Sequence, residues 1–152
     1  MSGMQTLFDA ETYQDIVRRV ESMRADSSRQ WGKMSPAQAL EHVSRALDMA
    51  IGKRPGRQLL LGKLIGWMFR SGFLGEKPFP KNSPTGPAFI VKDAPDFAAV
   101  QQKTKTLLRE FHELGERGCD SHIHGFFGPL TGAEWGRTQF KHLDHHLRQF
   151  GA

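Results

Sequence analysis

The chain has 152 residues, of which 38% are apolar and 24% are charged. This length and composition are typical of one globular domain and exclude a disordered chain. Its single cysteine, Cys119, excludes an internal disulfide framework and suits a reducing cytoplasm. The first residues carry no basic segment followed by an apolar run, so we expect no signal peptide. We therefore expect a single domain spanning residues 1–152 in the cytoplasm.

The net charge of +5 comes from one segment. Between Lys53 and Lys81 the chain has seven basic residues and one acidic residue, Glu76. These basic residues are interleaved with Leu, Ile, Trp and Phe, and the segment contains no nucleic-acid-binding motif. We interpret it as a solvated basic rim that faces an anionic small molecule, and we expect no nucleic-acid partner.

The first predicted helix follows Asp9, a suitable N-cap, and ends near residues 27–29. The second follows Ser35-Pro-Ala-Gln38, which has the pattern of a capping box with proline at the first helical position. It extends to about Ile51, and His42 lies at the edge of its apolar stripe. A lone histidine in that place is ordinarily a packed residue, so its role depends on ligands elsewhere.

A shorter, mostly apolar helix is predicted from Gln58 to Phe73. Such a helix can lie on a membrane surface. We instead expect it to cover one end of the core, and we expect no membrane partner. The four prolines of residues 75–87 are too many for a helix or a central strand, so this stretch is predicted to be an ordered crossover connection.

The third long helix is predicted to open at Asp93-Ala-Pro-Asp96 and to stop at residues 115–118. Residues 121–130 are predicted to form an apolar, turn-rich loop. Thr131-Gly-Ala-Glu134 is a second capping-box pattern and opens the last helix. Four long helices with one long crossover predict an all-α fold, a four-helix bundle.

The last helix carries the candidate chemistry. His142 and His146 stand four residues apart, which places their Cβ atoms about 6 Å apart on one helix face. Two imidazoles at this spacing can reach one divalent ion. His145 also lies near that face and could replace His146, although Gln149, one turn further on, favours His146. Two ligands do not complete a site, so a third must come from elsewhere.

Two stretches resemble the DinB-like (YfiT-like) superfamily. The stretch from Trp31 through Ser35 to His42 resembles the start of the second helix in those proteins, and His142-x-x-x-His146-x-x-Gln149 resembles their last helix. Residues 81–85 and 124–131 resemble a subgroup of unknown function. The resemblance implies an up-down-down-up bundle with a divalent metal, often zinc or nickel. It implies that the ligands are His42, His142 and His146.

That superfamily includes thiol S-transferases, a thiol-dependent maleylpyruvate isomerase and presumed metal-dependent hydrolases. An ion held by three histidines can lower the pKa of bound water, activate a thiolate or polarise a carbonyl. We therefore expect a metal-dependent hydrolase or small-thiol S-transferase acting on a small molecule that is anionic or carries a thiol. The alternative is a non-catalytic metal- or ligand-binding bundle. The sequence leaves open whether the protein forms a homodimer.

The sequence assigns no catalytic residue. Glu41 and Asp144 each adjoin a histidine, but neighbouring helical residues point about 100° apart, so neither is a good general base. Cys119 is predicted to lie in a turn and to be incidental. The basic side chains that we consider for contact with an anionic substrate are Arg57, Arg70 and Lys81.

Overall fold

The structure, a computed structural model, describes residues 3–54 and 56–152. Within these residues the chain is mostly helical, with five α-helices, one 3-10 helix and a two-stranded sheet, so the predicted all-α class is confirmed. In chain order the elements are α1 (Ala10–Ser22), α2 (Pro36–Ala50), α3 (Leu60–Leu74), η1 (Pro87–Phe89), α4 (Phe97–Cys119), β1 (Ile123–His124), β2 (Gly128–Pro129) and α5 (Gly132–Gln149).

The starts of α1, α2 and α5 are determined by local capping, as predicted. The Asp9 side chain accepts a hydrogen bond from the Thr12 backbone N–H at the start of α1. Both residues of each predicted capping box, at the starts of α2 and α5, make their reciprocal hydrogen bonds. These bonds satisfy backbone donors that the first helical turn leaves without partners.

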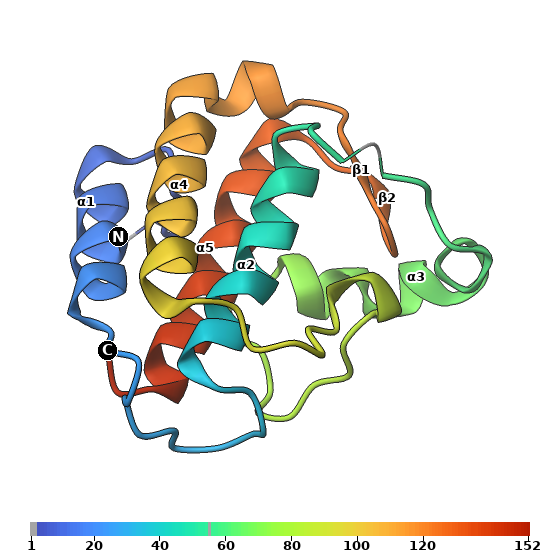
Figure 1. The fold of residues 1–152 in the computed structure, drawn as a ribbon. Helices are drawn as coiled ribbons and strands as arrows, with labels where there is room; N and C mark the ends of the chain where they lie inside the picture. Colours follow the sequence, from blue (N-terminus) through green and yellow to red (C-terminus); the bar gives the residue numbers. More distant parts are fainter. Residues whose placement is uncertain (1–2, 55) are drawn as a thin grey trace.

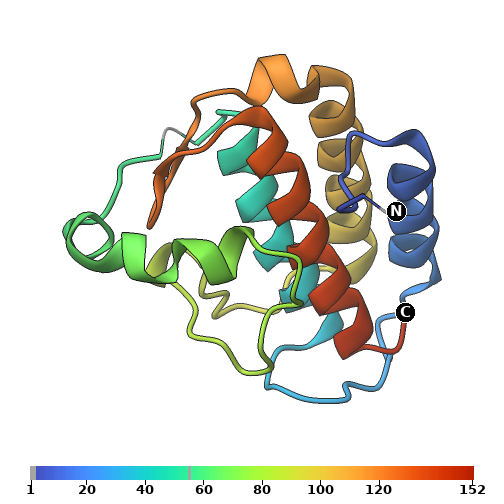
Figure 2. The same cartoon turned by 180° about the vertical axis from the view of Figure 1, so that it is seen from behind.

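Helices α1, α2, α4 and α5 lie side by side around one apolar core (Figure 1). Helices α2 and α4 run in one direction and α1 and α5 run in the other, and the reverse view agrees (Figure 2). The largest fully buried apolar side chains are Trp135, Phe111, Leu7, Ile16, Leu47, Leu108, Leu130, Leu143, Leu147, Val20 and Val43. Each such side chain contributes about 1.5–3 kcal/mol when buried. The four helices are therefore held together mainly by apolar packing.

Helix α3 differs from the expectation. It was predicted to cover one end of the core, but its exposed side chains include Leu60, Leu64 and Trp67, at 73%, 64% and 74% exposure. The residues that α3 buries are Gly62 and Gly66. Near its C-terminus Phe73 and Leu74 do pack against the core. The prediction is therefore wrong for most of the helix, which turns its apolar side chains outward.

The crossover between α3 and α4 lies across one face of α2. The Gln38 amide donates to the Val91 carbonyl oxygen at 3.3 Å, and the Arg45 guanidinium donates to the Ile90 carbonyl oxygen at 3.0 Å. Between them along the helix, His42 Nδ1 lies 2.9 Å from the Phe89 carbonyl oxygen. The crossover is thus ordered by side chains of α2.

Two further segments can be compared with the prediction. Helix α4 is interrupted by non-helical backbone at Gly115, within the predicted stop at residues 115–118, where a φ of +70° favours glycine, and helical turns continue beyond it to Cys119. The predicted loop 121–130 contains a small hairpin in which Ile123 pairs with Pro129 and His124 with Gly128. Strands of two residues are too short to produce an alternating pattern in the sequence.

Candidate metal centre

The structure brings the three predicted histidines together. His42 on α2 meets His142 and His146 on α5, and one ring nitrogen of each lies within 4.8 Å of the others. The Nε2 atoms of His42 and His142 are 2.8 Å apart. His142 and His146 occupy successive turns of α5, and α2 packs directly against that helix. Helix packing therefore places residues 100 positions apart in one cluster.

Hydrogen bonds to the other ring nitrogen orient two of these histidines. Because the Phe89 carbonyl oxygen accepts from His42 Nδ1, the proton of a neutral His42 is on Nδ1 and Nε2 keeps its lone pair. His146 Nδ1 lies 2.9 Å from Gln149 Oε1. The Gln149 amide nitrogen donates to the Trp31 carbonyl oxygen at 2.9 Å, which orients the Gln149 oxygen toward His146. Both histidines consequently present Nε2 as a ligand atom.

Burial keeps all three imidazoles neutral. Loss of solvent lowers the pKa of His142 well below its usual value, and the neighbouring histidines lower it further. Burial likewise lowers the pKa of His146 to about 3 and also lowers the pKa of His42. A neutral imidazole is the form that binds a metal ion. The site is therefore in its ligand form at neutral pH.

The donor set fits a divalent ion. Zinc–imidazole bonds of about 2.0–2.1 Å in a tetrahedral site place two ligand nitrogens about 3.3 Å apart. The spacings of the three ring nitrogens, from 2.8 Å for one pair up to a limit of 4.8 Å, bracket that value. Three imidazoles suit zinc, copper or nickel and leave coordination positions open. The three histidines could therefore hold a metal ion.

His145 does not belong to this cluster. Its ring makes an edge contact with Trp31, with centroids 5.5 Å apart, and lies 6.4 Å from the ring of Phe79. The group of possible ligands among the described residues contains His146 and not His145. Of the two alternatives that the sequence left open, the geometry favours His146.

Aromatic rings border the centre. The Phe89 ring lies 6.2 Å from the His42 ring, and the Phe79 ring lies 6.4 Å from the His142 ring, centroid to centroid. Both phenylalanines belong to the crossover between α3 and α4. That segment therefore contributes a hydrogen-bond acceptor and two apolar rings to the surroundings of the histidines.

One neighbouring residue, His124, was not predicted. It lies in the small hairpin, and its Nδ1 accepts hydrogen bonds from the backbone N–H groups of Phe126 and Phe127, at 3.1 and 3.2 Å. The ring proton is therefore on Nε2. Burial lowers the pKa of His124 to about 4. The sequence pattern does not reveal the turn at Phe126 and Phe127. It therefore could not identify His124 as the side chain that accepts hydrogen bonds from this turn.

The acids Glu41 and Asp144, each next to a histidine in the sequence, point away from the cluster, as the helical geometry predicted. Glu41 forms an ion pair with Lys103 at 3.0 Å. Asp144 forms an ion pair with Arg19 of α1 at 2.9 Å. Both carboxylates connect helices and take no part in the histidine cluster.

Other candidate residues are also accounted for. Cys119 is buried at the end of α4 rather than in a turn, and burial raises the pKa of its thiol to about 12, so it stays protonated. Arg70 binds Glu134 through both carboxylate oxygens, at 3.0 and 3.1 Å. The ammonium group of Lys81 lies over the Trp31 ring, 4.6 Å from its centroid. Lys81 is thereby connected with the histidine cluster, because Trp31 also accepts a hydrogen bond from Gln149, which contacts His146.

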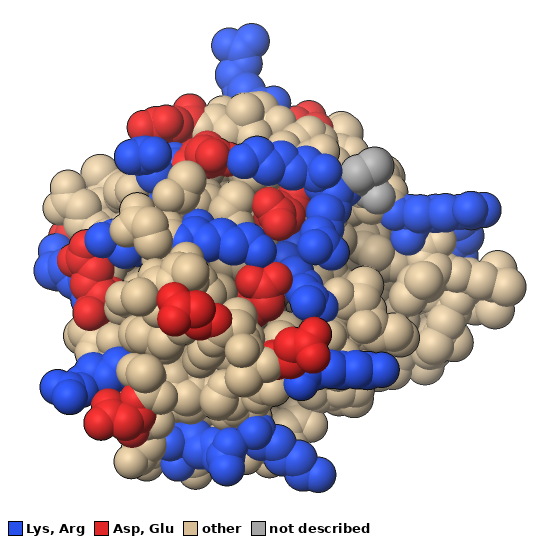
Figure 3. Space-filling model, in the orientation of Figure 1, with Lys and Arg blue, Asp and Glu red and all other residues tan. Residues whose placement is uncertain are grey.

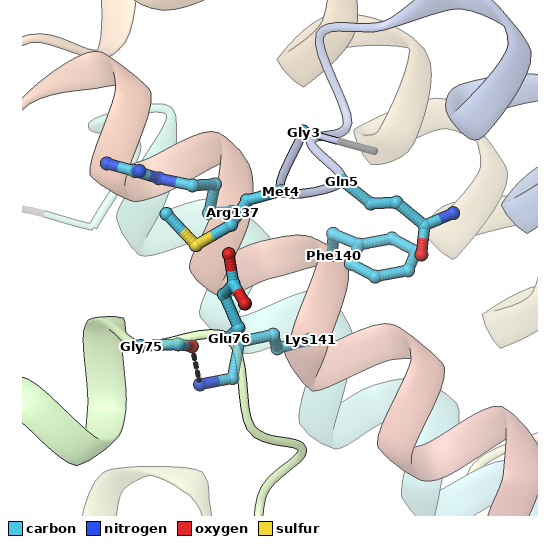
Figure 4. A pocket seen from close by; sticks show the side chains of 8 residues that line it. All are labelled: Gly3, Met4, Gln5, Gly75, Glu76, Arg137, Phe140 and Lys141. Carbon is cyan, nitrogen blue, oxygen red and sulfur yellow. Dashed lines mark hydrogen bonds between the residues drawn. The ribbon is translucent and has the colours of Figure 1, made fainter. Parts of the chain in front are cut away.

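A hollow beside α5 is separate from this centre. It lies between residues 3–5 of the N-terminal segment, Glu76 and the α5 residues Arg137 and Lys141 (Figure 4). Lys141 precedes His142 by one residue, so the two side chains point about 100° apart around the helix. The Lys141 ammonium group donates to the Gly75 carbonyl oxygen at 2.7 Å and so attaches the end of α3 to α5.

Comparison with known proteins yields one match. The model of the family described as "Protein of unknown function (DUF1569)" matches residues 4–152. No curated protein and no solved structure matches the chain.

Proposed function

We propose that this chain, which belongs to the DUF1569 family, is a divalent-metal-dependent enzyme acting on a small molecule. The proposed ligands are His42, His142 and His146, and the reaction is a hydrolysis or the transfer of a small thiol. The observation that carries the proposal is the convergence of three neutral imidazoles from two helices. Two of them have their Nδ1 protons engaged, as is usual for metal-binding histidines.

The chain's own groups prepare the site. When bound, a zinc or nickel ion supplies a Lewis acid with open coordination positions. The Phe89 carbonyl oxygen and the Gln149 amide hold the protons of His42 and His146 on Nδ1. The rings of Phe79 and Phe89 limit the access of water to the histidines. The protein therefore offers a largely buried donor set with two of its three rings held by hydrogen bonds.

The proposal includes a DinB-like fold. Its support is the order of the four long helices, their directions (Figure 1), the crossover that follows α3, and the origin of the histidines from the second and last of these helices. Taken together, these features agree with an up-down-down-up four-helix bundle. Fold likeness of this kind supports a metal site better than it supports any one reaction.

A non-catalytic metal-binding bundle is the second candidate. One observation favours it: among the residues that the structure describes, none at the centre acts as a catalytic base or nucleophile. The nearby acids Glu41 and Asp144 are paired elsewhere, and the Cys119 thiol is protonated. The two candidates differ in turnover, since only an enzyme needs the bound ion for a reaction.

The experiment joins metal content with turnover. Purified protein should bind about one divalent ion per chain, and it should turn over members of an ester-hydrolysis and thiol-transfer panel in a metal-dependent way. His42→Ala and His142→Ala should each weaken metal binding at least about ten-fold and remove activity. His145→Ala, the matched control, should retain both. Metal binding that is unchanged in His42→Ala would refute the site, and metal binding without turnover would favour the second candidate.

A further inference from the structure

Exposed apolar side chains are concentrated on one helix. Of the ten large apolar residues exposed in the described chain, seven lie between Leu59 and Phe69. Five of them form an arc of about 120° on α3, since successive helical residues are rotated by about 100°. We call this arc the α3 face; its residues are Leu60, Leu61, Leu64, Trp67 and Met68. We propose that the α3 face docks on an anionic membrane surface.

The outward direction of this face is fixed by the packing of α3. A Cβ atom added at Gly62 would lie 2.1 Å from the Phe126 carbonyl oxygen, and one at Gly66 would lie 3.1 Å from it. The helix backbone therefore lies directly on the hairpin at these glycines. The Gln58 amide donates to the same carbonyl oxygen at 2.9 Å. Because the hairpin leaves no room for a side chain at Gly62 and little at Gly66, this side of α3 cannot take the large apolar side chains of the α3 face, which point outward.

The surroundings of the α3 face are basic. Residues 49–75 contain five basic side chains and no acidic one. Lys53, Arg54 and Arg70 pair with acids of other elements. Within residues 3–54 and 56–152, no carboxylate pairs with Arg57 or Lys63. The two remain available for an anionic partner.

These two cations adjoin the apolar side chains. Arg57 and Lys63 line one hollow at the start of α3 together with Leu59 and Leu60. In Figure 3 the part of the surface that α3 forms is tan and blue, whereas red and blue groups mix over α1 and α4. The two cations therefore lie beside apolar side chains at the start of α3.

An anionic membrane matches this chemistry better than a second copy of the chain. A two-fold contact through the α3 face would bring the same basic residues together, with no acid on α3 to compensate them. A membrane surface accepts the apolar side chains among its acyl chains, and its anionic headgroups attract Lys and Arg. Trp67 is a side chain that favours this interface. No described helix is long and apolar enough to cross a bilayer, so α3 would lie along the surface.

This proposal departs from the sequence-based expectation of no membrane partner, and the reason is the direction of α3. It is independent of the metal centre, because none of the three histidines lies on α3. Loss of a metal ligand should therefore leave docking unchanged.

The test is sedimentation with vesicles. The full chain should bind vesicles of roughly three parts phosphatidylcholine to one part phosphatidylserine at low ionic strength, and binding should weaken with added salt. Pure phosphatidylcholine vesicles should bind at least about ten-fold less. The double variant Leu64→Ser/Trp67→Ser should lose binding about ten-fold or more, since it removes two exposed apolar side chains that would enter the membrane. Leu114→Ser, which changes an exposed leucine on α4, is the control and should bind as the wild type does.

Two further variants separate charge from apolar contact. Arg57→Gln/Lys63→Gln should lose most of the preference for phosphatidylserine, whereas Lys33→Gln, an exposed lysine elsewhere, should keep it. Tryptophan emission should shift to the blue on binding, and Trp67→Phe should remove most of that shift while still sedimenting. His42→Ala should bind vesicles as the wild type does.

Three results would overturn the proposal. The first is no sedimentation of the wild type with phosphatidylserine vesicles. The second is equal binding to both vesicle types. The third is a wild-type dimer that becomes a monomer in Leu64→Ser/Trp67→Ser and does not bind vesicles, which would assign the α3 face to a second copy of the chain.

Discussion

The Nδ1 partners of His42 and His146 come from different parts of the chain. His42 uses a main-chain carbonyl oxygen of the crossover, that of Phe89, and His146 uses the side-chain oxygen of Gln149. The Gln149 amide is itself held by the Trp31 carbonyl oxygen. The orientation of the proposed ligands therefore depends on segments that carry no ligand. The contribution of such a contact to metal affinity can be measured at Gln149, because a substitution removes its side-chain acceptor but cannot remove a main-chain carbonyl group.

Gln149→Ala should lower metal affinity by about 10–100-fold, because His146 would lose the acceptor that fixes its ring and its proton. Loss of the ligand in His146→Ala should cost more. Affinity would be measured by competition with a chromophoric chelator. Arg148→Ala, an exposed neighbour in the same helical turn, is the control and should bind as the wild type does. Equal affinities for Gln149→Ala and the wild type would mean that the Gln149 contact does not orient a ligand.

His124 should make the metal-free protein sensitive to acid. Its pKa is about 4 in the folded chain, against an ordinary value of 6.5. Between these values the unfolded chain binds a proton that the folded chain does not, so stability falls as the pH is lowered. The loss approaches about 1.4 kcal/mol per pH unit and totals on the order of 3 kcal/mol by pH 4.

His124→Asn isolates this effect. The asparagine oxygen can accept from the Phe126 and Phe127 N–H groups in place of Nδ1, but the side chain does not titrate. Denaturant unfolding with chelator present, at several pH values between 7 and about 4, should give a shallower decline for the variant. Parallel curves for the two proteins would show that His124 is not buried as described.

Among the elements, α3 offers a matched pair of glycines. Gly62 lies directly against the Phe126 carbonyl oxygen, whereas a Cβ added at Gly72 would have nothing within 4 Å. Gly62→Ala should therefore destabilise the protein by more than about 1 kcal/mol, since the contact at Gly62 is to backbone and cannot yield easily. Gly72→Ala should stabilise it by on the order of 0.5 kcal/mol through helix propensity.

The pair would be compared by denaturant unfolding. The sign should differ between the two substitutions although the chemical change is the same. If both stabilise the protein, α3 does not lie on the hairpin, and the direction of the α3 face would have to be revised.

The same elements show what the sequence could predict. The starts of α2 and α5 were predictable because a capping box consists of residues four positions apart or fewer, and those residues contact one another. The direction of α3 was not predictable in this way. Its apolar composition suggested burial, whereas its orientation depends on contacts between Gly62, Gly66 and a hairpin about sixty residues later. Local patterns do not contain such contacts.

For the molecule as a whole, the histidine cluster was predictable only in part. Helical spacing predicted that His142 and His146 share a face, but it did not decide whether His145 replaces His146 as a ligand. Nothing in the sequence around His42 distinguished it from a packed histidine. Its prediction as a metal ligand came from the resemblance to the DinB-like superfamily. The structure joins it to the others because α2 packs on α5. The partners Phe89 and Trp31 act through backbone carbonyl groups, which no residue type reveals.

That long-range geometry leads to a prediction about stability. A metal ion held by His42 and by the α5 histidines connects two helices that are distant in the sequence. An ion that binds only the folded chain stabilises it by about 2.7 kcal/mol when its free concentration is 100 times its Kd. For a chain of this size the change corresponds to a rise in Tm of roughly 5–10 °C.

Metal-free protein should nevertheless remain folded, because capped helices and an apolar core rather than the ion hold the four long helices together. Thermal unfolding followed by circular dichroism, with zinc and then with chelator, should show equal helix content at low temperature and a lower Tm without metal. The rise in Tm should be absent from His42→Ala and present in His145→Ala. Since His42 is the ligand contributed by α2, a full rise in His42→Ala would mean that the ion does not connect α2 with α5. A loss of helix on removal of the metal would mean that the ion, rather than the packing, holds the helices together.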